Sequence, residues 1–424
     1  MKKKNITLIC ALAMAMTLTA CGQSSTTSTN KAESTTEAEA STTETTADNE
    51  TADTENDSES SKAEAQTDNS DINSDDKKAE APDGQTPPDK PDGAGGENGQ
   101  GTPPDKPDGD GQGGPGGGSF GGSGTTVNIS DSTITTTADN SGGIQTTGGG
   151  TTNASNLTVT TSGNSSAAIR SDRGGGTVNV DGGTYTSNGY NSPAVYSTAD
   201  ITVKNAELTA NNSEALVIEG ENSITLEDCT VYGNMSDTNG TSSDENVHNV
   251  MIYQSMSGDA EVGTSSFSMT GGSLTSNNGD MFYITNTNCT LSLTGVKLTN
   301  KDSDGYLLNV TGNSASHGWG SAGSNGAQVT FTADNQTLKG NIRVDSISTL
   351  DMTLSGNSTF TGTVNVIDNE DGGTAVSDNA VITIENGSTW NLTGNCMISN
   401  LTNNGTINFN GYTITLADGT VLSE

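Results

Sequence analysis

The sequence predicts an all-β fold, a right-handed parallel β-helix of about ten coils over residues 126–424, preceded by a segment without regular structure. Short triplets of the order apolar, polar, apolar recur after Thr125, and such alternation marks a strand with one buried face. These triplets begin at Val127, Val178, Ile201, Ile224, Phe267 and Leu291. With Thr152 as a degenerate second copy, their intervals are 25, 26, 23, 23, 43 and 24 residues, and a nearly constant unit is typical of a solenoid.

Composition excludes two classes of protein. Asp and Glu total 52 against 16 Lys and Arg, and the net charge of −36 argues against a nucleic-acid partner, because phosphate contacts need clustered cations. The one long apolar run, Ile6–Leu18, is too short to span a bilayer as a helix. We therefore expect an acidic protein that is secreted or bound to the cell surface.

The N-terminus has the parts of an export signal. Lys2, Lys3 and Lys4 precede the apolar run, which closes with Leu-Thr-Ala before Cys21. This arrangement resembles a bacterial lipoprotein signal. The resemblance implies cleavage of residues 1–20, diacylation (palmitate) of the Cys21 thiol, and anchoring to the outer side of the cell membrane, for which two acyl chains suffice. The alternative is an ordinary secretory signal with a chance cysteine.

Residues 21–125 are predicted to be a disordered linker. They consist of Ser, Thr, Glu, Asp and Ala, then two copies of Thr-Pro-Pro-Asp-Lys-Pro-Asp-Gly that start at Thr86 and Thr102, then a glycine-rich run. Such a segment cannot bury enough apolar surface to offset the entropy of ordering. As a random coil it would span roughly 55 Å, enough to hold a folded domain away from the membrane, as in surface lipoproteins of Gram-positive bacteria.

Further columns of the repeat support three strands in each coil. Seven residues after the anchors come apolar residues in every unit, from Ile134 to Leu298, and seventeen after them come Ile144, Ile169, Val195, Ile218, Ile284 and Leu308. Right-handed winding follows from the rule for parallel crossovers. Four further triplets extend the count to about ten coils, and they begin at Val329, Val364, Ile382 and Ile407.

Two long intervals predict loops on one side of the solenoid. About 19 extra residues lie within 233–249 and 255–264, and about 14 more lie between Thr311 and Ala327. Insertions of this kind often form the binding face of a solenoid. Cys229, Cys289 and Cys396 fall in different coils without metal-ligand spacing, so we expect buried free thiols rather than disulfides or a zinc site.

The triplets and the Asn and Gly turns resemble the right-handed parallel β-helices of the pectate-lyase-like class. Residues 387–409 are similar to the last coils of autotransporter adhesin passengers. The lipoprotein signal, acidic linker and repeat together resemble β-helix surface lipoproteins of clostridia-like bacteria, some of which bind polysaccharides. The resemblance implies surface display and a polysaccharide or a host glycan as the partner.

Candidate glycan contacts come from the outward position beside the third strand. Counted from the anchors, this position reads Gln145, Arg170, Tyr196, Glu219, Tyr253, Thr285 and Asn309. Tyr196 and Tyr253 would lie about 10 Å apart on an exposed strip, with Tyr283 on its other flank and Trp319 in a nearby loop. Exposed rings could stack on alternate sugars of an extended glycan. The alternative is ordinary surface tyrosines and a tryptophan that covers the side of the solenoid.

Catalytic and metal sites are less well supported. Arg170, Asp172 and Arg173 lack the carboxylate cluster that a calcium-dependent lyase needs, and His248 and His317 fall in the insertions, so no catalytic residue is predicted. No cofactor is required. Calcium could bind at Asp302 and Asp304, or at Asp368, Glu370 and Asp371, but neither set matches a full calcium-loop pattern and solvated acidic turns are the favoured interpretation.

Three functions remain open on the sequence. We expect an adhesin or polysaccharide-binding protein that is not an enzyme, with a β-helix polysaccharide lyase or glycoside hydrolase as the alternative and a structural surface spacer as the third. An exposed aromatic strip would favour glycan binding. A groove that holds three or more carboxylates would favour the enzyme, and a featureless surface would favour the spacer.

Overall fold

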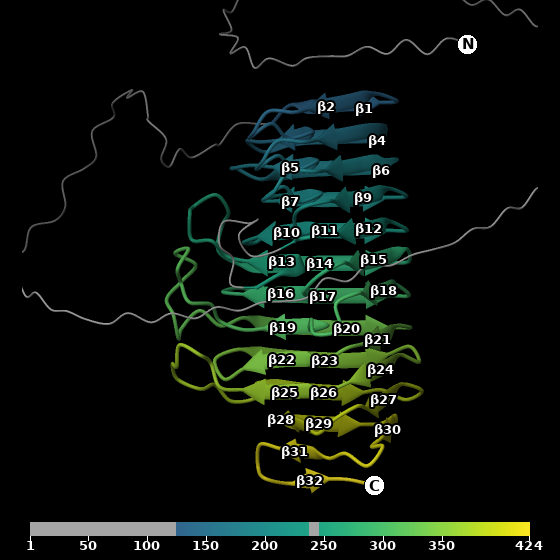
Figure 1. The fold of residues 1–424 in the computed structure, drawn as a ribbon, viewed down its shortest axis with the longest axis vertical. Helices are drawn as coiled ribbons and strands as arrows, with labels where there is room; N and C mark the ends of the chain where they lie inside the picture. Colours follow the sequence, from purple (N-terminus) through teal and green to yellow (C-terminus); the bar gives the residue numbers. More distant parts are fainter. Residues whose placement is uncertain (1–123, 237–245) are drawn as a thin grey trace, which may run out of the picture. The chain divides into compact units, whose positions relative to one another are not determined.

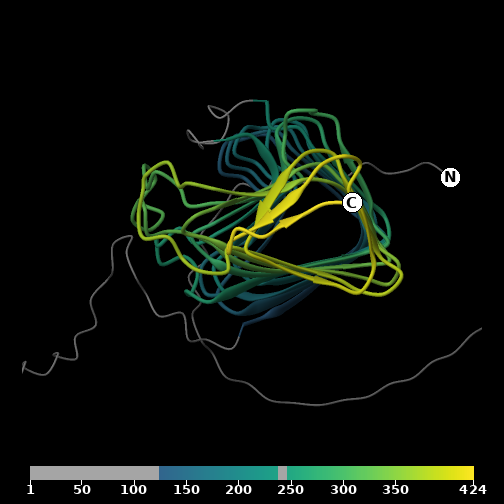
Figure 2. The same ribbon diagram turned by 90° about the horizontal axis from the view of Figure 1, so that it is seen from below.

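A computed structural model describes residues 124–236 and 246–424. These residues form a parallel β-helix in which the chain winds through three faces per coil (Figure 1). Viewed along its axis, the coils superpose around a common interior (Figure 2). The predicted signal peptide, Cys21 and nearly all of the predicted linker lie outside the described residues.

The first face is one arm of a 16-stranded sheet, here sheet A. Its strands are β1 (Thr126–Ser130), β4 (Gly150–Thr161), β6 (Gly176–Ser187), β8 (Asp200–Lys204), β11 (Ser223–Glu227), β14 (Thr264–Thr270), β17 (Asn288–Thr294), β20 (Gln328–Asp334), β23 (Thr349–Ser355), β26 (Ala380–Ile384) and β29 (Asn400–Asn403). The long strands β4 and β6 run through the corner into the second face, whereas later coils break there.

The second face changes sheet along the solenoid. In the early coils it belongs to sheet A and contains β2 (Thr133–Thr136), β9 (Glu207–Ala210), β12 (Thr230–Gly233), β15 (Ser273–Ser276) and β18 (Lys297–Asn300). In the later coils it is a four-stranded sheet C of β21 (Thr337–Lys339), β24 (Thr359–Gly362), β27 (Thr389–Leu392) and β30 (Thr406–Asn408).

The third face, sheet B, has 12 strands. They are β3 (Ile144–Thr146), β5 (Ile169–Ser171), β7 (Val195–Ser197), β10 (Leu216–Glu219), β13 (His248–Tyr253), β16 (Asp280–Thr285), β19 (Leu308–Val310), β22 (Ile342–Asp345), β25 (Val364–Ile367), β28 (Cys396–Ile398), β31 (Ile414–Leu416) and β32 (Val421–Leu422). The first eleven pair in parallel, one from each coil, and β32 pairs antiparallel with β31. The solenoid therefore has eleven coils, and β32 covers the last strand edge of sheet B.

The predicted anchor column is correct as far as Leu291, and of the four later anchors only Ile382 lies in it. Leu291 pairs with Phe331, and the column continues through Met352, Ile382 and Leu401. The triplet at Val364 belongs to sheet B and the one at Ile407 to sheet C. Each of these strands alternates in the same way, so periodicity alone does not assign a strand to a face.

The interior is a continuous column of aliphatic and aromatic side chains. Tyr185, Phe267, Phe282, Phe360 and Trp390 are fully buried in it, and the Trp390 indole donates to the Gly362 carbonyl at 3.1 Å. One-coil spacing places like residues above one another, as strand pairing requires. The interior thus fixes the direction of every outward side chain on sheet B.

Polar ladders fix the corners. Asp131, Asn156, Asn205 and Asp228 repeat at the corner between the first two faces with φ of 50°, 52°, 54° and 51°, a conformation that Asn and Asp tolerate. At the corner leading to sheet B the fully buried Ser166 accepts from the Ser141 amide at 2.9 Å, and Ser192 and Ser213 repeat this contact. These ladders satisfy backbone groups that the sheets leave unpaired.

Candidate functional site

The outward surface of sheet B carries the candidate site, and we call it the sheet B face. Strand pairing places one side chain of each coil in a single outward column, which reads Gln145, Arg170, Tyr196, Val217, Met251, Tyr283, Asn309, Arg343 and Asn365. Adjacent members are roughly 4.8 Å apart because that is the spacing of paired strands. The column therefore runs along the solenoid axis.

The predicted column is wrong in the fourth, fifth and sixth coils and correct again at Asn309 in the seventh. Tyr196 pairs with Val217 instead of Glu219, so Glu219 and Tyr253 form the next outward position along the strands. The turn before β10 is two residues shorter than the turn in the preceding coil, which moves the register by two. A shift of two keeps each side chain on its own face, so the apolar pattern did not reveal the change.

The predicted strip is not exposed. Tyr253 is 8% exposed and Tyr283 2%, and they form a cluster with Val217 and Met251 against which Tyr196 and Trp319 pack. The rings of Tyr253 and Trp319 lie 4.7 Å apart between centroids. Trp319 thus covers the tyrosine, and only Tyr196 and Trp319 keep ring surface that is partly accessible.

A long connection carries Trp319 onto the sheet B face. Residues 311–327, here the bridging loop, join β19 to β20 as the sequence predicted. Asn325 holds the loop: it is 1% exposed, and its side-chain amide donates to the carbonyls of Asn313 and Trp319, each at 2.9 Å. Gly318 and Gly320 flank the ring with φ of 79° and 75°, a conformation that favours glycine.

The loop and the first coils line a hollow of about 360 Å³, here the aromatic groove. Its lining consists of rings, amides, hydroxyls and one ion of each sign, namely Asn140, Ser165, Ala167, Arg170, Asn191, Pro193, Tyr196, Glu214, Val217, Met251, Tyr253 and Trp319. Four of the five predicted glycan contacts therefore meet in one groove. Tyr283, the fifth, lines a different hollow.

A buried carboxylate orients the tyrosines of the aromatic groove. Glu219, 1% exposed, accepts hydrogen bonds from the hydroxyls of Tyr196, Ser255 and Ser257, and from Tyr253 at 3.4 Å. Burial raises the pKa of Tyr196 well above its ordinary value, and the Glu219 charge raises it further. Tyr196 therefore remains a neutral donor fixed to Glu219.

Arg170 forms the other end of this groove. Its guanidinium pairs with Asp172 at 2.9 Å, donates to the Ser165 carbonyl at 3.3 Å and lies 5.6 Å from the centre of the Tyr196 ring. These contacts fix the side chain across the floor of the groove.

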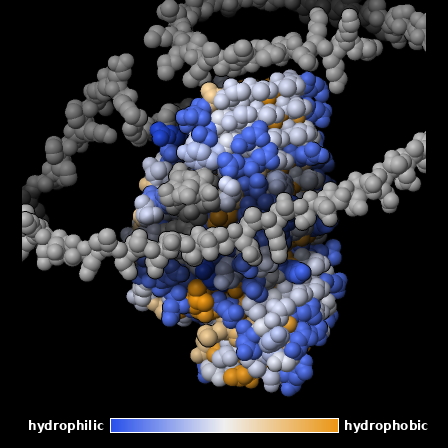
Figure 3. Space-filling view, viewed as in Figure 1, coloured by the Kyte–Doolittle hydropathy of each residue, from blue (hydrophilic) through white to orange (hydrophobic). Residues whose placement is uncertain are grey.

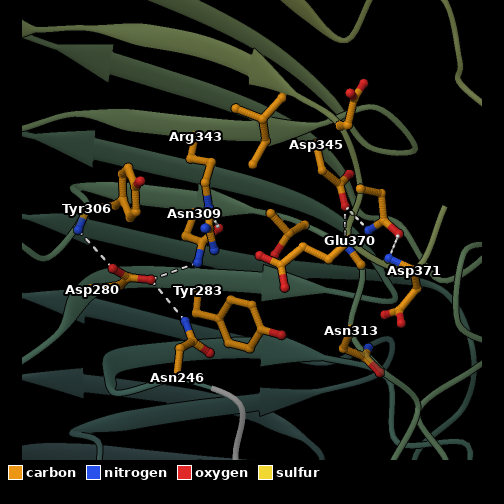
Figure 4. A pocket seen from close by; sticks show the side chains of 15 residues that line it. Asn246, Asp280, Tyr283, Tyr306, Asn309, Asn313, Arg343, Asp345, Glu370 and Asp371 are labelled. Carbon is orange, nitrogen blue, oxygen red and sulfur yellow. Dashed lines mark hydrogen bonds between the residues drawn. The ribbon is translucent and has the colours of Figure 1, made fainter.

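The later coils form a second hollow of about 350 Å³, here the acidic groove (Figure 4). Its charged lining comprises Asp280, Arg343, Asp345, Asp368, Glu370 and Asp371, and the neutral lining includes Tyr283, Tyr306, Asn309 and residues 311–313 of the bridging loop. In Figure 4 Asp280 lies on one side, Asp345, Glu370 and Asp371 lie on the other, and Arg343 and Tyr283 lie between. Five carboxylates thus share the groove with one cation.

Two of these carboxylates are buried and fully occupied by neutral donors. Asp280 accepts from the Tyr306 amide at 2.8 Å and from the side-chain amides of Asn309 and Asn246 at 2.7 and 2.9 Å. Asp345 accepts from the Gly312 amide at 2.8 Å and the Asn369 side chain at 2.5 Å. Their hydrogen bonds tie the strands to the loops that wall the groove.

The cation and the remaining acids are less constrained. Arg343 donates its Nε to Asn309 at 3.0 Å and lies 4.9 Å from the centre of the Tyr306 ring, and it forms no ion pair within the described ranges. Asp368, Glu370 and Asp371 follow β25 and are exposed. Arg343 was missed in the sequence because Ile342-Arg-Val344, an alternating triplet, was not assigned to a coil.

The predicted cation sites differ from one another in structure. Asp302 accepts the Gly279 amide at 2.8 Å and the Asp304 amide at 3.0 Å, so it closes a turn. Asp368, Glu370 and Asp371 line the acidic groove. Across residues 124–236 and 246–424 no three His, Cys, Asp or Glu side chains are grouped closely enough to hold a metal ion.

The two histidines contact neighbouring residues of the solenoid, and the three cysteines of the described residues are buried. His248 is buried in β13 with Nδ1 2.8 Å from the Asn246 carbonyl, and His317 lies 4.7 Å from Trp319 between ring centroids. Cys229, Cys289 and Cys396 are free and buried, as predicted. Burial raises the pKa of all three thiols, that of Cys396 to about 11.

Comparison of the chain with family models, with curated proteins and with solved structures gives no match. Within the described part of the chain, no helix has the length and apolarity to cross a membrane.

Proposed function

We propose that the protein is a cell-surface adhesin or polysaccharide-binding protein, anchored by lipid on Cys21, that binds an extended glycan along the sheet B face. The aromatic groove carries this proposal. It places the half-buried rings of Tyr196 and Trp319 beside amide and hydroxyl groups. Apolar surface with a few oriented polar groups is the usual composition of a small-molecule site.

The polar groups of this groove repeat with the coils. Asn140, Ser165 and Asn191 occupy the same corner in successive coils, each with a φ between 50° and 58°. A polymer lying along the axis would meet one such group per coil, while its sugar rings would stack on Trp319 and Tyr196. Periodic polar groups beside rings suit a repeating ligand better than a compact one.

The anchor and linker complete the proposal. A diacylated Cys21 would hold the chain on the outer face of the membrane of a Gram-positive bacterium, and the acidic segment up to residue 125 would carry the β-helix outward. Metabolic palmitate labelling of the wild type and of Cys21→Ala tests this part. Equal labelling of the two proteins would contradict it.

The binding test replaces the accessible rings. We expect Trp319→Ala and Tyr196→Ala each to weaken retention of the purified full-length protein on polysaccharide probes by about tenfold, since a stacked ring contributes roughly 1 kcal/mol or more. Tyr412→Ala is the matched control, because Tyr412 is 39% exposed and lies outside both grooves. Retention unchanged in both groove variants, or no retention of the wild type on any probe, would refute the proposal.

A polysaccharide lyase or glycoside hydrolase is the second candidate, and one observation favours it. The acidic groove holds five carboxylates together with Arg343 and Tyr283. A groove with three or more carboxylates is the feature that we expected to favour an enzyme. Two of the five are occupied by structural hydrogen bonds, which leaves Asp368, Glu370 and Asp371 as the free acids. Product release from the retained polysaccharide, with and without Ca²⁺, and its loss in Glu370→Gln would support this candidate over simple binding.

A further inference from the structure

We infer that the sheet B face is specific for uncharged glycans and excludes polyuronates, with Asp368, Glu370 and Asp371 as the specificity-determining residues. The inference rests on the proposed function, because it names the class of glycan that the same face accepts.

The aromatic groove offers no free cation to a carboxylate ligand. Arg170 is its one basic residue, and the guanidinium already contacts Asp172 and the Ser165 carbonyl. Glu214, 4% exposed, lines the groove, and Glu219, 1% exposed, accepts hydrogen bonds from Tyr196 and Tyr253. A uronate bound here would meet a guanidinium whose charge is already paired with Asp172, whereas a neutral sugar would stack on Trp319 without needing a cation.

The acidic groove repels anions. Its five carboxylates face the single guanidinium of Arg343, and none of the three ion pairs in the described residues includes any of these groups. Asp368, Glu370 and Asp371 stand on one exposed segment at the rim. Like charges brought together at an interface repel each other and thereby suppress binding of the wrong partner.

The two grooves act on the same ligand because they follow one axis. Tyr196 and Arg343 belong to the same outward column and are five coils apart, roughly 24 Å along the solenoid. A polymer long enough to occupy the aromatic groove and continue along the face would enter the acidic groove. A polyuronate would bring one carboxylate per sugar within the Debye length of about 8 Å.

Matched pairs of polymers test the specificity of the full-length protein. The probes are hydroxyethyl cellulose against carboxymethyl cellulose, and highly methyl-esterified pectin against de-esterified polygalacturonate, since each pair shares a backbone and differs in charge. We expect retention of at least one neutral member and at least about tenfold weaker retention of its charged partner at low ionic strength. Equal or stronger retention of a charged member, with or without Ca²⁺, overturns the inference while leaving glycan binding intact; no retention of any probe overturns both.

Charge variants locate the effect. The variant Asp368→Asn/Glu370→Gln/Asp371→Asn should raise the charged-to-neutral retention ratio at least about fivefold, because Arg343 would then face only the two occupied carboxylates. The control Glu207→Gln/Asp351→Asn/Glu385→Gln removes the same charge from exposed positions that line neither groove. An equal rise in the control would mean that net charge, not the acidic groove, sets the ratio, and would overturn the inference.

A third variant asks whether Arg343 supplies the new contact. Arg343→Gln is added to the variant Asp368→Asn/Glu370→Gln/Asp371→Asn. The retention of charged polymer relative to neutral polymer should then return toward the wild-type value, because Arg343 is the one cation among the described residues that line the acidic groove. Gln keeps a donor for the Asn309 side chain that Arg343 now contacts. A ratio that stays high without Arg343 would contradict the assignment of anion discrimination to this groove.

Discussion

Single residues of this protein act mainly through position in a coil. Asn and Asp occur at the positive-φ corner because they tolerate that conformation and can bond to the coil below, as Asn205 does to Asp181 at 2.8 Å. Asp302 has a comparable role in the turn before β19, where two backbone amides donate to its carboxylate. Such contacts depend on ionisation.

Asp302 should make the protein less stable in acid. The amides of Gly279 and then Asp304 lower the pKa of Asp302, so its contribution to stability is complete above the unfolded pKa of about 3.9 and is lost as pH falls through the lower folded pKa. We expect Asp302→Asn to reduce the free energy of unfolding by about 1 kcal/mol at neutral pH. The difference from wild type should vanish well below about pH 3.

Urea unfolding at several pH values measures this difference. Asp304→Asn is the control in the same turn, because the Asp304 carboxylate accepts only from Ser303 at 3.5 Å. A difference between Asp302→Asn and wild type that stays constant from neutral to acidic pH would show that the amide contacts do not depend on the charge.

At the scale of elements, the sequence predicts a strand wherever burial of one face makes apolar and polar residues alternate. Strands in every early coil were predicted because Val178, Ile201 and Ile224 alternate with polar residues and fill one interior column. The two-residue slip at β10 escaped detection because Leu216 and Ile218 are both apolar and both face inward. A register shift of two residues keeps every side chain on its own face of the sheet. Such a shift is set by the length of the turn, and the hydrophobic pattern does not show it.

The candidate site was predicted only in part, because the hydrophobic pattern describes strands and not the loops that cover them. The bridging loop was located by its length, and Tyr196, Tyr253, Arg170 and Trp319 were named, yet the covering of Tyr253 by Trp319 depends on tertiary hydrogen bonds from Asn325. No periodic pattern describes the path of an inserted loop. The acidic groove was missed as a unit because its acids come from separate coils.

Asn325 should control the position of Trp319. Asn325→Ala removes two donors and the acceptor of the Asn313 amide, which costs roughly 1–3 kcal/mol locally, and should release the bridging loop while the solenoid stays folded. Acrylamide quenching of fluorescence reports the change, because the second tryptophan, Trp390, is fully buried. Quenching should increase, and the retention of glycan probes should decrease with it.

Ser321→Ala is the control for this variant. Ser321 is exposed in the same loop, and its backbone carbonyl, not its side chain, accepts from the Ser324 amide. Quenching that rises equally in both variants would indicate general loosening of the loop. Quenching unchanged in Asn325→Ala would show that Trp319 is held by its ring contact with Tyr253 alone.

At the scale of the whole molecule, each coil contacts mainly its neighbours. All parallel strand pairs join adjacent coils, and the inward residues repeat in register through the described solenoid. Most of the surface in Figure 3 is polar, with apolar patches toward the C-terminal coils, where Val376, Met397, Tyr412 and Val421 are exposed. A solenoid of this kind has stability that is approximately a sum over coils and their interfaces.

Removal of one complete coil should therefore leave a folded protein, whereas removal of one residue fewer should not. Asp200 pairs with Ser223, and Glu207 pairs with Thr230, so both strands of this coil repeat at an interval of 23 residues. Deletion of residues 200–222 therefore places Ser223 where Asp200 was. Ile224 then takes the place of Ile201 and pairs with Val178. Deletion of residues 200–221 shifts the following strand by one and turns Ile224 and Leu226 toward solvent. Far-UV circular dichroism with thermal melting should show a cooperative transition for the first deletion and none, or one at much lower temperature, for the second. Similar melting of both would mean that the coils do not depend on the register observed here.

The first deletion also removes Val217 and Glu219, so it should abolish retention on glycan probes while the fold persists.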